Sequence, residues 1–379
     1  MNGTLPNNKR NKFKDTISEI RLPLAIKIVY IAAALCVPIY VAFLISEGFS
    51  DFFNRYISSL MRGALAYLTS WIPFSLAEFL IILIPVIAFL MCDLIVKKFG
   101  DSLAELLSSI ICVFSVLAIV FTTFTIGFAP AYRGSTLDKR LGIATGEVSA
   151  EQLYDTTIEL IENINELVDD VTYGADGFSV MPYGYTEMNI KLLDAFEAVS
   201  DEYSFMPRLN SRIKPVMLSE AMSYTHITGI YTFFTGEVNV NVAFPDYTLP
   251  FTAAHELSHQ RGVARENEAN FMAFLACSKS TDSYIRYCAY VNLYEYVSNA
   301  LYIADYTLYM KTWAKLPDCV KGELVAYSEF MDTYKDSTAS EVSGAINDTF
   351  LKLHGTEGTK SYGMVVDLAV AYFAPKQEN

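Results

Sequence analysis

Two histidines and a glutamate lie together in the segment His255-Glu256-Leu257-Ser258-His259. On an α-helix, side chains at positions i and i+4 project from one face, so His255 and His259 are spaced to share one metal ion. Glu256 lies between them and can reach a water bound to that metal. Zinc lowers the pKa of such a water toward ~7, the carboxylate takes its proton, and the hydroxide attacks a carbonyl. The spacing therefore predicts metal-assisted hydrolysis with Zn²⁺ as the cofactor.

A catalytic zinc ion takes three protein ligands and keeps one open position, so a third ligand is expected nearby. Gly262 follows His259 by three residues and can end the first helix in the left-handed conformation. A second helix is predicted to start around Ala264. It carries Glu266 and Glu268, and either carboxylate can return to the metal.

Counted from Glu266, the second helix reads E-x-x-A-N. This resembles the glutamate helix of the gluzincin metallopeptidases, whose E-x-x-[SA]-D pattern supplies the third ligand, and the resemblance favours Glu266. It also implies that Asn270 holds a histidine ligand through its side-chain carbonyl. The chain departs from that pattern in having Asn for Asp and in placing the glutamate seven residues after the second histidine.

The composition separates membrane segments from a globular part. Of the 379 residues, 52% are hydrophobic and only 18% are charged, which is apolar for a soluble protein. The formal net charge is −14, which argues against nucleic acid as a partner. The lipid bilayer is therefore the first partner that the sequence predicts.

Three apolar runs are each long enough to cross a hydrocarbon core of ~30 Å, namely residues 22–46, 73–96 and 106–130. Residues 49–71 mix aromatic and charged side chains and are typical of a segment lying in the membrane interface. We therefore expect a three-helix transmembrane anchor over residues 22–130.

The basic residues predict the orientation of this anchor. Residues 1–21 form a polar, basic tail, and with three crossings they lie on the same side as the loop at Lys97-Lys98. The positive-inside rule makes that side cytoplasmic. Residues 131–379 are then an extracytoplasmic domain of a multi-pass protein with a cytoplasmic N-terminus.

The region after the anchor is predicted to be α+β, mostly helical with a small β-sheet. Helices are predicted over residues 149–171, 187–203, 215–225, 282–311, 320–335, 340–353 and 361–373. The first of these begins with the capping box Ser149-x-x-Gln152. A period-two pattern over 231–242 predicts two strands that turn at Thr235-Gly236.

The second of these strands ends a few residues before the metal helix. In zincin peptidases, which the metal motif resembles, an edge strand beside the zinc helix pairs with an extended substrate backbone. Glu237, Asn239 and Asn241 are therefore candidate substrate-binding residues. The alternative is an ordinary strand whose polar face lies in water.

A wider resemblance covers most of the chain. The segment from Ser219 to Cys277, with HELSHQRGVAREN at its centre, and the PFSLAE sequence from Pro73 resemble a bacterial membrane-protein family catalogued as domain of unknown function 3810. The resemblance implies a membrane-anchored, zincin-like zinc metallopeptidase in a bacterial cell envelope.

Together, these patterns predict hydrolysis of a peptide bond in a membrane-proximal protein or peptide. Zinc would be bound by His255, His259 and Glu266, with Glu256 as general base. One alternative is a non-catalytic envelope protein whose metal joins two helices, with Glu268 as a fourth ligand. Another is a zinc amidase acting on cell-wall peptide. The sequence leaves the natural substrate and the oligomeric state open.

Overall fold

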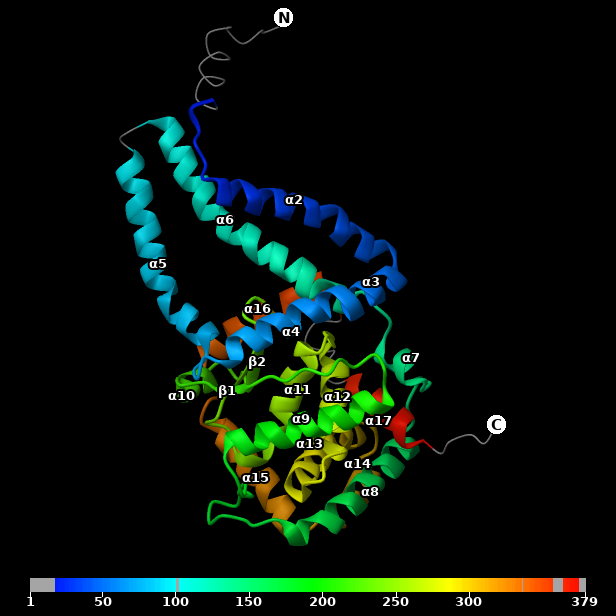
Figure 1. Cartoon of the computed structure of the whole chain (residues 1–379). Coiled ribbons are helices and arrows are strands. Elements are labelled where there is room, and N and C mark those ends of the chain that lie inside the picture. The colour runs from blue at the N-terminus through cyan, green and yellow to red at the C-terminus, as the bar shows by residue number, and fades with distance from the viewer. Residues whose placement is uncertain (1–17, 100–101, 336, 357–363, 375–379) are drawn as a thin grey trace, which may run out of the picture.

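The structure of the chain is a computed structural model that describes residues 18–99, 102–335, 337–356 and 364–374. Long apolar helices extend from one end of a mainly helical body that holds one small sheet (Figure 1). Most of the predicted basic tail, residues 1–17, lies outside the described residues.

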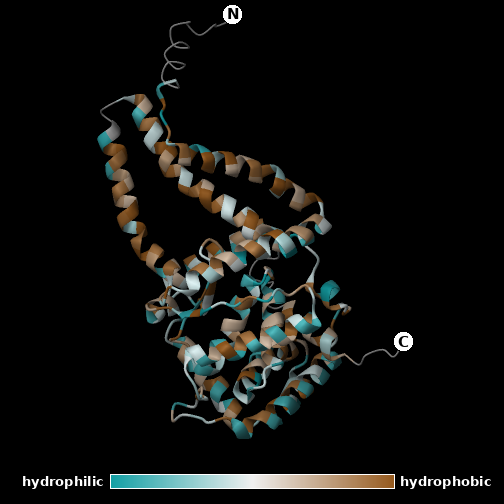
Figure 2. Ribbon diagram, viewed as in Figure 1, coloured by the Kyte–Doolittle hydropathy of each residue, from teal (hydrophilic) through white to brown (hydrophobic). Residues whose placement is uncertain are grey.

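Three helices near the N-terminus are long and apolar enough to cross a membrane: α2 (Leu24–Ile45), α5 (Leu76–Phe99) and α6 (Leu103–Gly127). Most of their residues are hydrophobic (Figure 2), and many of their large apolar side chains are exposed. Pro38 and Pro85 lie within the first two of them. The predicted apolar helices are therefore confirmed as helices, with ends within about three residues of the expected ones, whereas their orientation stays a prediction.

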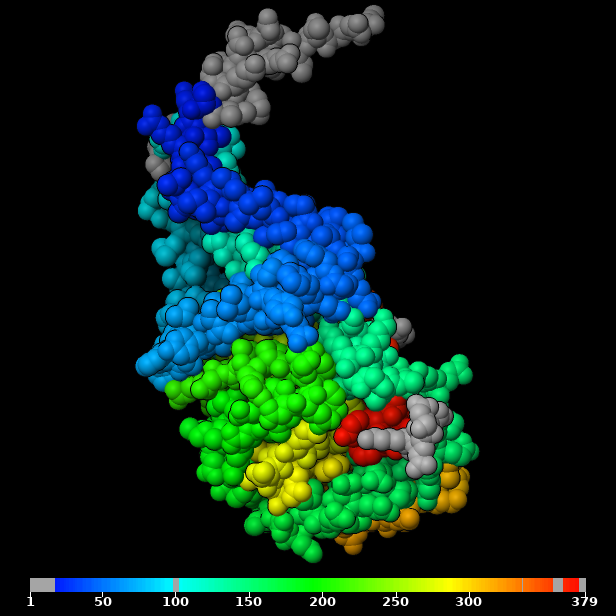
Figure 3. Space-filling model, turned by 45° about the vertical axis from the view of Figure 1, so that its right-hand side comes forward, coloured from blue at the N-terminus to red at the C-terminus, as the bar shows by residue number. Residues whose placement is uncertain are grey.

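Residues 47–70 form one helical ridge across the top of the body, made of α3 (Glu47–Phe53), the π-helical turn η1 (Asn54–Ser58) and α4 (Ser59–Ser70). In Figures 1 and 3 this ridge lies between the apolar helices and the body. Its outer side exposes large apolar residues, namely Phe52, Tyr56, Leu60 and Leu68, whereas Asn54 and Arg62 are buried on its inner side. This amphipathic arrangement agrees with an interfacial segment.

The body is built around α11 (Leu249–Gln260), α12 (Glu266–Ser278) and α13 (Ser283–Ala304), which pack on one another. Helix α8 (Ala150–Leu167) covers α13 and begins with the predicted capping box of Ser149 and Gln152. The other helical elements of the body before the sheet are η2 (Ala129–Tyr132), α7 (Leu137–Leu141), η3 (Val168–Asp170) and α9 (Tyr185–Glu202). Those after it are η4 (Asp246–Thr248), α14 (Tyr306–Trp313), α15 (Asp318–Asp332), α16 (Thr338–Leu353) and α17 (Val365–Phe373).

Two predicted helices differ from those observed. The long helix expected over 282–311 breaks at Asp305, whose carboxylate accepts hydrogen bonds from the backbone amides of Thr307 and Leu308 and so starts α14. The helix expected over 215–225 is reduced to α10 (Ser219–Ser223).

The sheet has three short strands, β1 (Ile213–Pro215), β2 (Gly229–Thr232) and β3 (Glu237–Val240), in the order β1-β3-β2. The hairpin of β2 and β3 is confirmed, and Gly236 in its turn has a φ of 71°, which glycine adopts without strain. β1 was not predicted, and it pairs with β3 in parallel. Because β3 is therefore the central strand, the prediction that it is an edge strand is wrong.

The candidate substrate-binding residues on β3 lie inside the protein. Glu237 forms an ion pair with buried Lys214, and its carboxylate accepts the backbone amides of Leu76 and Ala77 in the first turn of α5.

The amides of the other two candidates bond within the protein as well. Asn239 donates to the carbonyl of Ile230, and Asn241 donates to the Ser223 hydroxyl. Like Glu237, both side chains are buried. The predicted substrate contacts of Glu237, Asn239 and Asn241 are therefore corrected to structural roles.

Candidate metal centre

The helix that carries the two histidines is short, buried and sharply ended. Pro250 lies in the first turn of α11, where a missing N–H costs nothing. After Gln260 the chain turns at Gly262, whose φ is 91°. The Gly262 amide donates to the His259 carbonyl and the Val263 amide donates to the Ser258 carbonyl, which together form a Schellman motif. The predicted helix end at Gly262 is thus confirmed, and it lets the chain return toward its own metal face.

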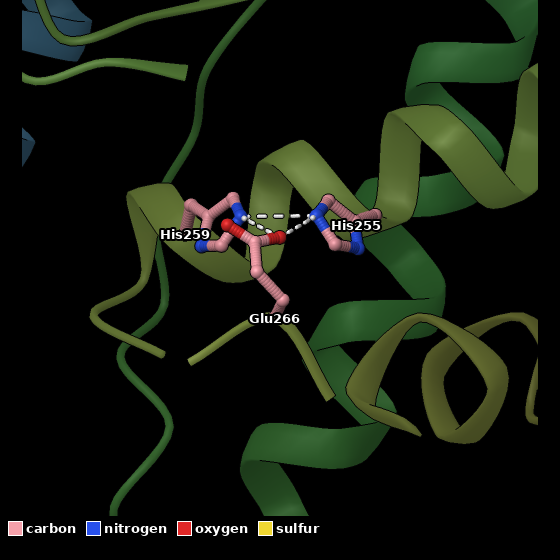
Figure 4. A group of neighbouring side chains, drawn as sticks. All are labelled: His255, His259 and Glu266. Carbon is pink, nitrogen blue, oxygen red and sulfur yellow. Dashed lines mark hydrogen bonds and ion pairs between the residues drawn. The ribbon is translucent and has the colours of Figure 1, made fainter. Parts of the chain in front are cut away.

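Helix α12 starts at Glu266, four residues after Gly262, and so brings the Glu266 side chain back to the histidines. The Glu266 Oε2 atom lies 3.1 Å from His255 Nε2 and 3.5 Å from His259 Nε2, and the two Nε2 atoms are 3.0 Å apart (Figure 4). Ligands at 2.0–2.1 Å from a tetrahedral zinc ion are about 3.3 Å from one another. The three atoms therefore have the spacing of zinc ligands.

Both imidazole rings are held by their other nitrogen. His255 Nδ1 donates to the side-chain carbonyl of Asn270 at 2.7 Å, and His259 Nδ1 donates to the backbone carbonyl of Val263 at 2.7 Å. Such partners fix the tautomer and leave Nε2 as the atom that can bind a metal. The structure thus places Asn270 where the resemblance implied.

The charged groups of this cluster shift one another's pKa values so that the charged forms are favoured. Burial lowers the pKa of His259, but the neighbouring Glu266 carboxylate more than offsets this and raises it to about 9. Burial likewise opposes ionisation of Glu266, yet the two histidines hold its pKa well below the usual range. The residues therefore form a strongly polarised group, and a divalent cation can take the place of the protons that they share.

Glu256 lies beside this cluster, against strand β2. A side chain at Gly229 would come within 2.8 Å of Glu256 Cγ, so glycine is required there for the strand to pass so close. Burial raises the pKa of the Glu256 carboxyl, and the charges of His255 and His259 partly offset that rise. A carboxylate that is more basic than usual suits a general base.

Glu268, the alternative ligand, points elsewhere. Its Oε1 atom accepts hydrogen bonds from the Leu137 amide at 3.0 Å and from Arg265 Nη1 at 2.8 Å. Within the described residues, the metal-binding group holds His255, His259 and Glu266 only. The structure therefore brings the preferred third ligand to the histidines and leaves Glu268 to join α12 to α7.

A pocket of about 1670 Å³ opens beside the metal cluster. Its walls include His255, Glu256 and the outer edge of β2, together with apolar side chains such as Phe128 and Ile346. No lysine or arginine of the described chain lines it. The size exceeds that of ordinary small-molecule sites, so the pocket can take a segment of polypeptide.

Glu295 of α13 is a residue of this pocket that sequence reasoning missed. Its Oε1 atom accepts a hydrogen bond from the Tyr247 hydroxyl at 2.9 Å. Burial raises its pKa to about 7, which the bond from Tyr247 partly counteracts. The sequence does contain a signal, because Glu295 and Arg286 are the charged residues of an otherwise uncharged helix that is rich in apolar and aromatic side chains.

Replacing Glu295 with glutamine should change how stability depends on pH. A folded-state pKa of about 7 lies above the ordinary value of 4.5, so the wild type loses stability as pH rises between these values. The variant should lack this loss and be more stable at pH 8 by up to about 3 kcal/mol. Thermal unfolding from pH 4.5 to 8 would measure it, with exposed Glu329→Gln as the matched control. The same pH profile in wild type and Glu295→Gln would contradict the assignment.

Comparison with known proteins identifies a family and no further relatives. A family model described as "Protein of unknown function (DUF3810)" matches residues 49–370. No curated protein and no solved structure matches the chain. The matched range includes nearly all of the ridge of residues 47–70, together with α5, α6 and the cluster of His255, His259 and Glu266. The chain therefore belongs to the DUF3810 family.

Proposed function

We propose that this chain is a membrane-anchored zinc metallopeptidase, with His255, His259 and Glu266 as metal ligands and Glu256 as general base. The observation that carries the proposal is the convergence of two Nε2 atoms and a carboxylate oxygen at zinc-ligand spacing, beside a buried glutamate. Three protein ligands are typical of catalytic zinc, whereas structural sites have four. The position of Glu268 away from the cluster therefore favours catalysis over a structural metal site.

The protein's own groups would perform the proton transfers. Bound zinc supplies a Lewis acid that acidifies water. The Glu256 carboxylate takes a proton from the attacking water and returns it to the nitrogen of the leaving amine. Asn270 and the Val263 carbonyl keep both imidazoles in one orientation throughout.

Strand β2, rather than β3, is the edge at which an extended substrate would bind. The Asn241 amide donates to the Thr228 carbonyl, and the alternation of an antiparallel pair directs the backbone of Gly229 and Tyr231 to the other side. That side is the pocket wall beside Glu256. A peptide pairing with this edge would lie next to the general base.

The position of the cluster favours a substrate close to the membrane. Helix α6 ends at Gly127, and the ring of the next residue, Phe128, lies 6.1 Å from the ring of His259. A peptide bond held at the cluster would thus be near the end of a candidate membrane span. We therefore propose a membrane-proximal protein or peptide as the substrate.

Metal content is the first test of the proposal. Purified wild-type protein should contain one zinc ion per chain by elemental analysis, and a His255→Ala, His259→Ala variant should contain none. Glu268→Ala is the matched control and should keep its zinc. Absence of zinc from the wild type after metal loading would remove the metallopeptidase proposal.

The proposed orientation predicts that the body lies outside the cytoplasm. An alkaline phosphatase fused after Asn379 should be active in intact bacteria, because three crossings place the C-terminus outside. Exposed Cys319 should react with a membrane-impermeant maleimide, and Cys319→Ser should abolish that labelling. An inactive fusion and a protected Cys319 would place the body in the cytoplasm.

A further inference from the structure

A second cavity, of about 340 Å³, lies where the interfacial ridge meets the body. Four arginines line it and define what we call the arginine pocket: Arg55, Arg62, Arg140 and Arg261. In Figure 3 the ridge of residues 47–70, in light blue, rests directly on the green segment around residues 204–207, which forms the opposite wall. Ser59, Ser135 and Ser204 also line it. The Ser59 hydroxyl donates to the Arg55 carbonyl, and the Ser135 hydroxyl donates to the Asp51 carboxylate.

The arginine pocket has an excess of positive charge. Asp51 is the single acidic residue among the described residues that line it. Its Oδ1 atom already accepts Arg140 Nη2 at 3.1 Å and the Ser135 amide at 2.9 Å. Three of the four guanidinium groups therefore have no carboxylate partner within the described lining.

Arg62 and Arg261 are also almost completely buried, with 1% and 3% of their surface exposed. Arg62 donates to the carbonyls of Gly127 and Asn54, while Arg261 donates to those of Leu257 and Leu209.

Carbonyl oxygens satisfy hydrogen bonds but do not neutralise a charge. Among the residues that the structure describes, the Nε atoms of both Arg62 and Arg261 have no hydrogen-bond partner. A buried charge that lacks an opposite charge destabilises the fold, so an anion that entered the pocket would offset this cost.

Both groups stay charged at neutral pH. Burial lowers the pKa of Arg62 only to about 10, and a guanidinium group is not deprotonated near neutral pH. The cavity therefore presents cations, rather than neutral donors, to whatever occupies it.

Guanidinium groups are suited to phosphate, because the planar fork of arginine bonds two phosphate oxygens at once. The surroundings of the pocket carry exposed aromatic and apolar side chains. Tyr56 lines it and is 57% exposed, on the same ridge as exposed Phe52 and Leu60. Aromatic and apolar residues of this kind lie at the level of lipid headgroups.

We propose that the arginine pocket binds a phosphate-bearing anion, either as a free ion or as the headgroup of an anionic phospholipid. Arg62 and Arg261 form its floor, and exposed Arg55 lies at its mouth. This site is separate from the proposed peptidase function, although Arg261 directly follows α11 and so links the pocket to the metal helix.

Binding can be tested on the purified full-length protein without any catalytic assay. In neutral detergent, inorganic phosphate at constant ionic strength should raise the unfolding temperature saturably, relative to chloride. In nanodiscs, phosphatidylglycerol should raise it relative to phosphatidylcholine, and native mass spectrometry should find one retained phosphatidylglycerol per chain. An effect in the first arm identifies a free anion; an effect in the second arm alone identifies a lipid headgroup.

Variants of the lining make the test specific. Arg55→Gln removes an exposed side chain at the mouth and should raise the dissociation constant about tenfold, as expected for one charge-assisted hydrogen bond. Arg62→Lys keeps the charge but loses the fork, and it should weaken binding as well. The matched control is Arg208→Gln, an exposed arginine that pairs with Asp201 outside the pocket and should bind normally.

Two results would overturn the proposal. The first is the absence of any effect of phosphate and of phosphatidylglycerol on the wild type. The second is binding that Arg55→Gln and Arg62→Lys leave unchanged. Protein treated with a chelator should bind the anion as before, so failure of the zinc site and failure of the arginine pocket are distinguishable.

Discussion

Glu256→Gln should abolish peptide hydrolysis while the protein keeps its zinc. Glutamine has the same shape but cannot accept the proton of the attacking water, so kcat should fall by about 10²–10⁴-fold. The substitution should not disturb folding, because Glu256 is buried and its raised pKa reflects the cost of carrying a charge there. Cleavage of a quenched fluorescent peptide library, measured beside zinc content, would test this.

Two controls separate catalysis from structure in that experiment. Zinc content should match the wild type and the unfolding temperature should be no lower than that of the wild type, which would exclude a damaged site. Glu295→Gln alters another carboxyl of the same pocket and should retain hydrolysis. Wild-type activity in Glu256→Gln would remove the general-base assignment and leave the metal site in place.

Glu266→Ala should weaken zinc binding far more than Glu268→Ala does. Changes at residues that merely support a metal ligand reduce affinity by about 10–100-fold, so removal of a ligand should exceed about 100-fold. Glu268 instead accepts hydrogen bonds from the Leu137 amide and Arg265, and its loss should destabilise the fold by about 1–3 kcal/mol.

Competition with a chromophoric zinc chelator and thermal unfolding would give both quantities for the same samples. Each variant should affect mainly one of the two quantities. Glu266→Ala should lower chiefly the zinc affinity, whereas Glu268→Ala should lower chiefly the stability. The reverse order of zinc affinities would transfer the role of third ligand to Glu268.

The residues of the metal cluster were predictable because their geometry is local. His255 and His259 need only a helix, Gly262 ends it, and Glu266 starts the next helix a few residues later. Each step follows from backbone rules that act over one or two turns. Asn270 follows in the same way, one helical turn beyond Glu266.

The role of β3 was not predictable because it depends on a distant partner. β1 has three residues and ends at Pro215, so it gives no period-two pattern from which a strand can be recognised. Its pairing nevertheless turns β3 from an edge into the centre of the sheet, and it brings Lys214 to Glu237. Polar residues that the sequence suggests as a solvent-facing or substrate-facing edge are instead buried, with Glu237 in an ion pair and Asn239 and Asn241 in internal hydrogen bonds.

The arginine pocket was unpredictable for a related reason. Its arginines come from three separate parts of the chain, around residues 55–62, 140 and 261. Nothing in the local sequence of any one of them indicates that the others are near. Only the packing of the ridge on the body reveals that these cations share one space.

The contacts between the ridge and the metal helix have a consequence for how this protein can be released or engineered. Asn54 Nδ2 donates to the Gly262 carbonyl at 2.9 Å, and Arg62 packs against the same glycine. Glu237 of the sheet accepts the first amides of α5. A soluble fragment starting at Ala131 would lose all of these partners and leave the turn after His259 unsupported. If the body has the proposed activity, proteolytic release from the membrane helices should therefore yield an inactive fragment.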